Sequence, residues 1–236
     1  MLILAIVVLL VLASAIVAEL YTRHLASSKV AQAVQCEVQD TASVSFGAAP
    51  PVLWQSLSRH YSDISVQTAG NQVRSAKGMK VNLDIRDIKL NNTNNSQGTI
   101  GSLSGTVSWS ADGIKQSIQA ALPLLGKFVS GDVTTNPGDG TVTLKGTFDS
   151  VTIKPQIVNN GLSLQIVSLT ALGSTMSTNT IQTELDNLTS KATQNYPLGI
   201  HADSVRVTST GIEGAFSTSN ATIPAGGSQD PCFSNL

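Results

Sequence analysis

The stretch "GMKVNLDIRDIKL", from Gly78 to Leu90, decides the fold. Apolar side chains occupy every second position from Met79 to Ile85, and polar or charged side chains lie between them. This period of two predicts a β-strand with one apolar and one solvated face. After Ile85 the apolar positions shift by one residue, to Ile88 and Leu90, which predicts a β-bulge or a sharp bend within a curved sheet.

Other segments repeat the alternation. In "TIGSLSGTVSWS", residues 99–110, the positions Leu103, Gly105, Val107 and Trp109 share one face. Glycines inside this strand predict bending or close approach of another group to its backbone. The segment 140–148 alternates in the same way, and turn-forming residues separate the strands. Strands with one polar face favour antiparallel pairing.

One segment follows a helical period instead. "GIKQSIQAALPLLGKF", residues 113–128, places Ile114, Ile118, Leu122 and Leu125 on one side of a helix. A second helix is predicted at 178–194, from a similar apolar stripe that ends before a proline. We expect an α+β fold in which the first stripe covers the curved antiparallel sheet around the strand of residues 79–90.

The composition excludes a nucleic-acid partner. The formal net charge of the 236 residues is −1, and only 12% of the residues are charged. Proteins that bind nucleic acid need clustered cations to neutralise phosphates. We therefore expect any contact with a membrane to be mainly apolar.

The N-terminal segment, residues 1–18, is apolar apart from Ser14. Its small residues offer signal-peptidase patterns, and its length also approaches that of a membrane-spanning helix. A cleaved signal peptide and a retained anchor both remain open. Either one places residues 19–236, which we interpret as a single domain, outside the cytoplasm, in the periplasm or cell envelope.

The chain has two cysteines, Cys36 and Cys232. In an oxidising compartment such a pair predicts a disulfide. The three histidines are scattered and form no pattern with metal-ligand spacing, so neither a metal nor another cofactor is expected.

Enzyme signatures are largely missing. The stretch "GSLSG", residues 101–105, has Leu103 where a nucleophile elbow has serine. Catalytic groups that are distant in sequence can still converge in the fold. His60, near Asp63, and His201, near Asp203, are the histidines to inspect for such a site, although a surface or structural role is the more common one for an isolated histidine.

A rigid proline pair precedes the apolar residues Val52, Leu53 and Trp54. Tryptophan favours the headgroup level of a bilayer, so these three side chains are candidates for membrane contact. The alternative is that they cover the protein core.

The segment 43–70, the strand 77–90 and the late segment "YPLGIHADSVRVTSTGIEGAF", residues 196–216, together resemble the LmeA-like family of actinobacterial, including mycobacterial, cell-envelope proteins. The order of features is also similar to that family: an export signal, a short helix, a long alternating strand and a closing strand pair. The resemblance covers most of the chain beyond the apolar segment.

The resemblance implies a tubular lipid-binding (BPI-like) domain, in which a curved antiparallel sheet wraps around one or two helices and leaves an apolar groove. It also implies a part in lipomannan and lipoarabinomannan maintenance, and a phospholipase A activity has been ascribed to a member of the family. No family catalytic motif can be placed on this sequence, so hydrolysis is left open and the catalytic residues are unknown.

We therefore expect a protein that binds phospholipid or a phosphatidylinositol-type glycolipid at the membrane surface. The alternatives are a phospholipase A that cleaves the same lipid, and a non-catalytic structural envelope protein whose core is fully packed. The predicted lipid-binding residues are Val81, Leu83, Ile85, Val107, Trp109, Ile114, Ile118, Leu122 and Leu125.

Overall fold

The computed structural model describes residues 2–93, 95–121, 131–147, 149–171, 177–193 and 197–224, together with Cys232. Its helices and strands, in chain order, are α1 (Leu2–Val38), β1 (Ala42–Phe46), α2 (Val52–Ser58), β2 (His60–Thr68), β3 (Gln72–Val73), β4 (Ala76–Lys77), β5 (Met79–Leu90), β6 (Ser96–Ser110), α3 (Ala111–Ala121), β7 (Val133–Asn136), β8 (Thr141–Lys145), β9 (Asp149–Val158), β10 (Gly161–Ala171), α5 (Thr178–Thr193), the 3₁₀ turn η2 (Pro197–Gly199), β11 (His201–Thr208) and β12 (Gly211–Pro224).

The strands form two main antiparallel sheets and a short hairpin. The larger sheet has six strands in the order β1-β2-β5-β6-β12-β11, and the smaller has four in the order β10-β9-β8-β7. β11, at the edge of the larger sheet, lies against β9 of the smaller one, so the two sheets are joined along this contact. The predicted α+β class with an extended antiparallel sheet is confirmed, and the sheets are not closed into a barrel.

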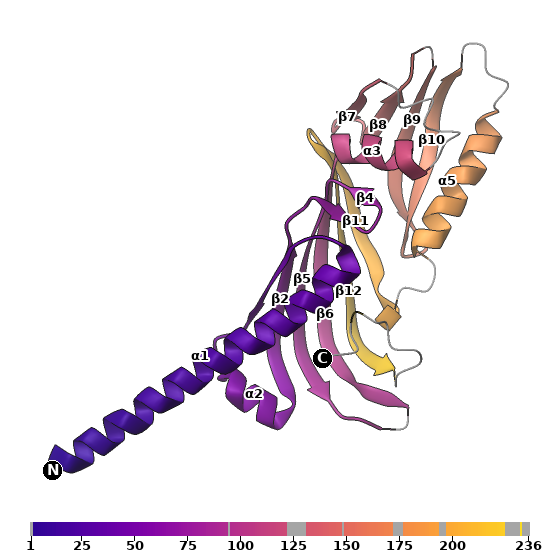
Figure 1. Cartoon of the computed structure of the whole chain (residues 1–236). Coiled ribbons are helices and arrows are strands. Elements are labelled where there is room, and N and C mark those ends of the chain that lie inside the picture. The colour runs from indigo at the N-terminus through magenta and orange to yellow at the C-terminus, as the bar shows by residue number, and fades with distance from the viewer. Residues whose placement is uncertain are drawn as a thin grey trace.

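α1 is a single helix of 37 residues. Its second half packs against β1 and α2, whereas its apolar first half projects away from the body (Figure 1). The predicted strand 79–90 is β5, with the same bounds. The predicted helix after residue 110 is α3, whose first turn is capped by Ser110 Oγ, which accepts a hydrogen bond from the backbone N–H of Gly113 at 3.1 Å.

The one-residue shift of the apolar positions after Ile85 coincides with unusual backbone conformations in two strands of the larger sheet. Asp87 in β5 and Asn220 in β12 both adopt left-handed backbone angles, with φ of 54° and 52°. The register is constant on both sides of these residues, as the pairs Arg86↔Ser102 and Ile88↔Ile100 show. The predicted irregularity is thus a pair of left-handed backbone conformations in β5 and β12, without the register shift of a β-bulge. The larger sheet that contains them is curved (Figure 1).

Gly101 of β6 lies between Asp87 and Asn220 in a row across the sheet. A Cβ atom at position 101 would lie 2.7 Å from the Cβ of Asp87, which is too close for any residue other than glycine. The alternation of inward-facing and outward-facing side chains shifts by one residue at the row of residues 87, 101 and 220. The buried residues that flank it form one hydrophobic core: Ile88, Ile100, Leu103 and Ala221.

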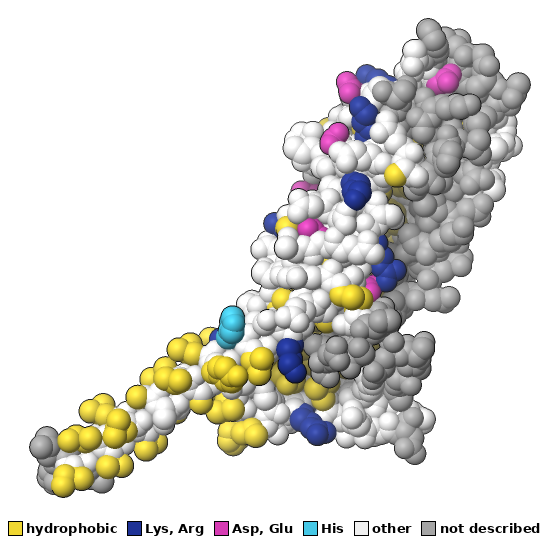
Figure 2. Space-filling view, in the orientation of Figure 1, with side chains coloured by type: hydrophobic (Ala, Val, Ile, Leu, Met, Phe, Trp, Pro, Cys, Tyr) yellow, Lys and Arg dark blue, Asp and Glu magenta, His cyan; other side chains and the backbone are white. Residues whose placement is uncertain are grey.

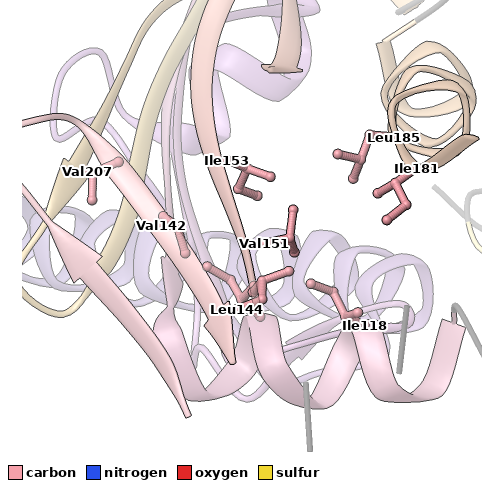
Figure 3. Packing of buried hydrophobic residues seen from close by; sticks show 9 residues of the cluster. Ile118, Val142, Leu144, Val151, Ile153, Ile181, Leu185 and Val207 are labelled. Carbon is pink, nitrogen blue, oxygen red and sulfur yellow. The ribbon is translucent and has the colours of Figure 1, made fainter. Parts of the chain in front are cut away.

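A second core belongs to the smaller sheet. Side chains from α3 and α5 point toward those of β8 and β9 (Figure 3). Leu144 at 1% exposure and Ile181 at 2% show that water is excluded from this core. Its buried members are Ile114, Ile118, Val142, Leu144, Val151, Ile153, Ile181, Leu185 and Val207.

Candidate functional site

The apolar face of the larger sheet is the first candidate site. Val81 of β5 pairs with Val107 of β6, Leu83 lies between Val66 of β2 and Gly105 of β6, and paired residues share one face of a sheet. Strands β5 and β6 are central in the six-stranded sheet. The sequence pattern therefore places an apolar surface at the middle of this sheet.

This apolar face is incompletely covered. Val81, Leu83, Ile85 and Val107 are each only half-buried. Apolar side chains at the centre of a sheet with a filled core are normally sequestered from water, as those of β8 and β9 are in the smaller sheet. The larger sheet thus presents apolar surface on which a flexible apolar ligand can lie.

Phe216 of β12 belongs to the same face and was missed in the sequence. It pairs with Gly105, and a Cβ atom at Gly105 would lie 2.3 Å from the Phe216 ring. The glycine therefore makes room for the ring, as predicted for glycines in this strand. The signal was present in the alternation around Phe216, but only the strand register shows that Phe216 lies in the same row as Gly105 and Leu83.

The predicted lipid-binding residues do not form one surface. Ile114 is 2% exposed and, like Ile118, belongs to the core of the smaller sheet. The expectation that this helical stripe covers the sheet around Leu83 and Ile85 is wrong, because Leu83 and Ile85 pack against the separate core at residues 88, 100, 103 and 221. Leu122 and Leu125 lie outside the described residues.

Trp109 lies between the two regions. It is half-buried against the core of the smaller sheet, and its indole N–H donates a 2.8 Å hydrogen bond to the carbonyl oxygen of Lys77. Both the contact and the hydrogen bond fix the ring at the junction of β6 and α3. This position indicates a structural role for Trp109.

Two hollows lie elsewhere on the surface. One, of about 590 Å³, adjoins the disulfide and is lined by residues that include Gln72, Arg74 and Lys77. The other, of about 290 Å³, lies over β1, β2 and β5. Most of its lining residues alternate onto the polar face of the sheet, among them Ser45, Ser65 and Asp84.

His60 lies on the exposed surface of the larger sheet. Its Nε2 atom is 2.6 Å from Asp87 Oδ1, and Lys89 Nζ is 3.1 Å from Asp87 Oδ2. The hydrogen bond from Lys89 and then that from His60 lower the pKa of Asp87. This arrangement is a hydrogen-bonded cluster of polar side chains on the surface, centred on Asp87.

His201 comes nearer to a catalytic arrangement but does not complete it. Its Nε2 atom is 3.1 Å from Asp203 Oδ1 and 3.5 Å from Ser217 Oγ. A serine hydrolase triad needs the acid on one ring nitrogen and the serine on the other. Here both partners meet the same nitrogen, so the geometry does not activate Ser217.

The predicted membrane-contact residues also separate. Val52 is 0% exposed because it faces inward from the first turn of α2, so its predicted membrane contact is wrong for this conformation. Leu53 and Trp54 are exposed, at 38% and 63%, and Leu57, which the sequence analysis did not single out, is 75% exposed.

The predicted disulfide is present. Cys36 near the end of α1 is bonded to Cys232, with a Cα–Cα distance of 5.5 Å. Disulfides are typical of exported proteins. α1 also contains a stretch apolar and long enough to cross a membrane, which is equally typical of a signal sequence near an N-terminus. Both features indicate export.

An exported α+β protein with an open apolar sheet face has the features of a lipid-binding protein. Comparison with known families agrees with this class. The model of the family described as LmeA-like phospholipid-binding matches residues 17–217, and the chain belongs to that family. The resemblance predicted from the sequence is thereby confirmed.

Similar sequences come from mycobacteria. Proteins of Mycobacterium bovis and of two Mycobacterium tuberculosis strains, each described as uncharacterized, are 55% identical to this chain over 235 residues. The alignments cover all of this chain and 67% of each relative. No solved structure matches the chain.

Proposed function

We propose that this protein holds the acyl chains of a phospholipid, or of a phosphatidylinositol-type glycolipid, on the apolar face of its six-stranded sheet. Residues 1–18 are the membrane-associated segment in this proposal, and residues 19–236 form a single lipid-binding domain in the cell envelope. The biological role that fits this activity is support of lipomannan and lipoarabinomannan maintenance. Membership of a phospholipid-binding family supports the ligand class.

One observation carries the location of the ligand. The apolar positions of β8 and β9 are closed off by α3 and α5, while four apolar side chains at the centre of the larger sheet are half-buried: Val81, Leu83 and Ile85 of β5 and Val107 of β6. Each buried methylene group of an acyl chain contributes about 0.8 kcal/mol, so a chain lying along β5 and β6 needs few polar contacts. A structural protein with a filled core would be expected to bury these central side chains fully.

Hydrolysis of the lipid is not part of the proposal. His60 is paired with Asp87, and the partners of His201 share one ring nitrogen. Neither arrangement activates a nucleophile. Release of fatty acid by the purified protein, abolished by Ser217→Ala, would establish the phospholipase A alternative instead.

The test uses the full chain extracted from membranes in mild detergent and analysed by lipid mass spectrometry. The parent protein is expected to carry phospholipid or glycolipid. Leu83→Asp places a charge on the apolar face and is expected to lose most of this lipid. Asn82→Asp, on the opposite face of the same strand, is the matched control and should retain it.

The folded state of each variant is checked by circular dichroism, and Leu83→Gln serves as a milder replacement if Leu83→Asp does not fold. A parent protein that carries no lipid, and takes none up from liposomes, would contradict lipid binding. Unchanged lipid content in a folded Leu83 variant would contradict the proposed face.

A further inference from the structure

The short helix α2 presents an apolar outer surface. It turns Val52 and Gln55 inward and leaves Leu53, Trp54 and Leu57 exposed. In the space-filling view, yellow side chains continue from the projecting half of α1 onto the part of the body where Figure 1 places α2 (Figure 2). The apolar surface of α2 is therefore continuous with that of α1.

A carboxylate fixes α2 to α1. Glu19 of α1 accepts hydrogen bonds from the backbone N–H groups of Val52 and Leu53, at 2.8 and 2.9 Å. Arg23, one turn further along α1, contacts the same carboxylate at 3.1 Å and the carbonyl oxygen of Phe46 at 2.7 Å. These bonds satisfy free N–H groups of the first turn of α2 and set its height along α1.

Buried Gln55 fixes the other side of α2. Its amide donates to the carbonyl oxygen of Pro50 at 2.6 Å, and its side-chain oxygen accepts from the backbone N–H of Ser62 at 3.0 Å. Ser62 belongs to β2, so α2 is held between α1 and the larger sheet. The exposed side chains of α2 consequently have a defined position relative to both.

That position coincides with the end of the apolar run of α1. Residues 2–18 span about 25 Å as a helix, which approaches the hydrocarbon thickness of a bilayer. Glu19 is the first charged residue after this run. Tyr21, which is exposed, follows within one turn, and tyrosine and tryptophan are both enriched where a protein crosses the membrane surface.

We propose that α2 docks on the surface of the bilayer that holds the first half of α1, with Leu53, Trp54 and Leu57 inserted at the level of the lipid headgroups. This inference rests on the membrane-associated role of residues 1–18 in the proposed function. The hydrogen bonds of Glu19 hold α2 in a fixed position on α1. The domain is therefore held at a fixed distance from the membrane surface.

Docking also orients the larger sheet. β2 begins at His60, two residues after α2 ends, and the backbone N–H of Leu90, at the end of β5, bonds to the carbonyl oxygen of Arg59 at 2.9 Å. The start of β2 and the end of β5 therefore lie beside α2. A docked α2 brings this end of the apolar face to the membrane surface, where a lipid can pass between bilayer and sheet.

The test measures tryptophan depth in the full chain reconstituted into phosphatidylcholine nanodiscs. The protein has two tryptophans, so each single replacement leaves one fluorescent tryptophan. The fluorescence of Trp109→Phe comes from Trp54, and that of Trp54→Phe comes from Trp109. Lipids that carry a spin label near the headgroup are expected to quench Trp54 strongly. Removing Trp54 should abolish most of this quenching, and aqueous iodide should reach Trp54 poorly.

Three further variants separate docking of α2 from simple proximity to the membrane. In the Trp109→Phe background, Leu57→Asp should reduce lipid quenching of Trp54 several-fold. Val167→Asp, which places the same charge at an exposed apolar position of β10, should leave it unchanged. Glu19→Gln weakens the link between the helices and should broaden the depth distribution of Trp54.

Trp54 that is quenched by iodide and not by labelled lipid would overturn the docking of α2. The outcome is distinguishable from failure of the proposed function, because bound lipid is measured separately by mass spectrometry. A protein that retains lipid with Trp54 in water loses only the docking inference. A protein with lipid-quenched Trp54 and no bound lipid loses only the proposed lipid site.

Discussion

Asp40 shows how one side chain joins distant parts of this protein. It follows α1 and accepts hydrogen bonds from the backbone N–H groups of Gly70 and Asn71, at 3.0 and 2.9 Å, and from the Asn71 side chain at 2.9 Å. Burial raises the pKa of Asp40, but the hydrogen bonds from Asn71, Thr41 and Gln72 outweigh burial and lower the pKa to about 2.

The low pKa of Asp40 predicts a pH dependence of stability. Because the folded-state pKa lies below the ordinary value of 3.8, the ionised group stabilises the fold above pH 4, and this contribution is lost as the pH falls toward 2. Asp40→Asn should lower the free energy of unfolding at pH 7 by about 1 to 3 kcal/mol, as expected for lost bonds to a charged acceptor. Urea unfolding of both proteins between pH 7 and pH 3 measures this difference, which should shrink at the acidic end. A difference that is constant over this range would contradict the assignment to the Asp40 carboxylate.

Individual residues show which features the sequence could and could not predict. The one-residue shift of the apolar positions after Ile85 was visible in the sequence, and it correctly indicated a backbone irregularity. The partners Gly101 and Asn220 were not visible, because the row they form with Asp87 depends on strand pairing. Val52 failed for a related reason: an apolar residue next to exposed Leu53 and Trp54 gives no sign of which one faces inward.

At the scale of secondary-structure elements, the two sheets differ in how far their apolar faces are covered. β8 and β9 are enclosed by α3 and α5, and β5 and β6 are not fully covered. Periodicity predicted β5 and the start of α3 well, because alternation and helical spacing are local properties. It did not predict that α3 packs with the smaller sheet, because an apolar stripe identifies a face that must be buried and not the partner that buries it.

A pair of leucine truncations measures this contrast. Leu144→Ala removes a fully buried side chain and should lower the free energy of unfolding by about 2 to 5 kcal/mol, with lipid content per folded molecule unchanged. Leu83→Ala removes a half-buried side chain and should cost less stability, but it should lower lipid content. Chemical unfolding and lipid mass spectrometry of the same preparations give both quantities. The opposite ranking, with Leu144→Ala depleting lipid more than Leu83→Ala, would place the ligand in the smaller sheet.

At the scale of the whole molecule, the disulfide connects residues that are 196 positions apart. Closing so long a loop restricts the unfolded chain and is expected to stabilise the fold by on the order of 5 kcal/mol in the chain-entropy model. Cys36→Ser with Cys232→Ser should therefore unfold at lower denaturant concentration than the parent. Parent protein treated with reductant should match the double variant, and equal midpoints for oxidised and reduced parent would contradict a stabilising role.

The family and the fold class were predictable from the sequence because both depend on features spread along the chain: the apolar N-terminus, the alternating strands and the closing strand pair. The division of the strands into two sheets was not, since the contact of β11 with β9 joins segments about 50 residues apart. The alternation of apolar residues is the same in an open and in a closed sheet. Whether an apolar face is exposed is therefore a property of the assembled molecule.

The disulfide has a consequence for the covalent topology of the protein. Cys36 lies in the same helix as the apolar segment, so residues 36–232 form a closed ring attached to that helix. A protease that cuts one peptide bond inside the ring opens it without separating the fragments. The domain is then shed from the helix only by a cut before Cys36, by a second cut in the ring, or by reduction of the bond.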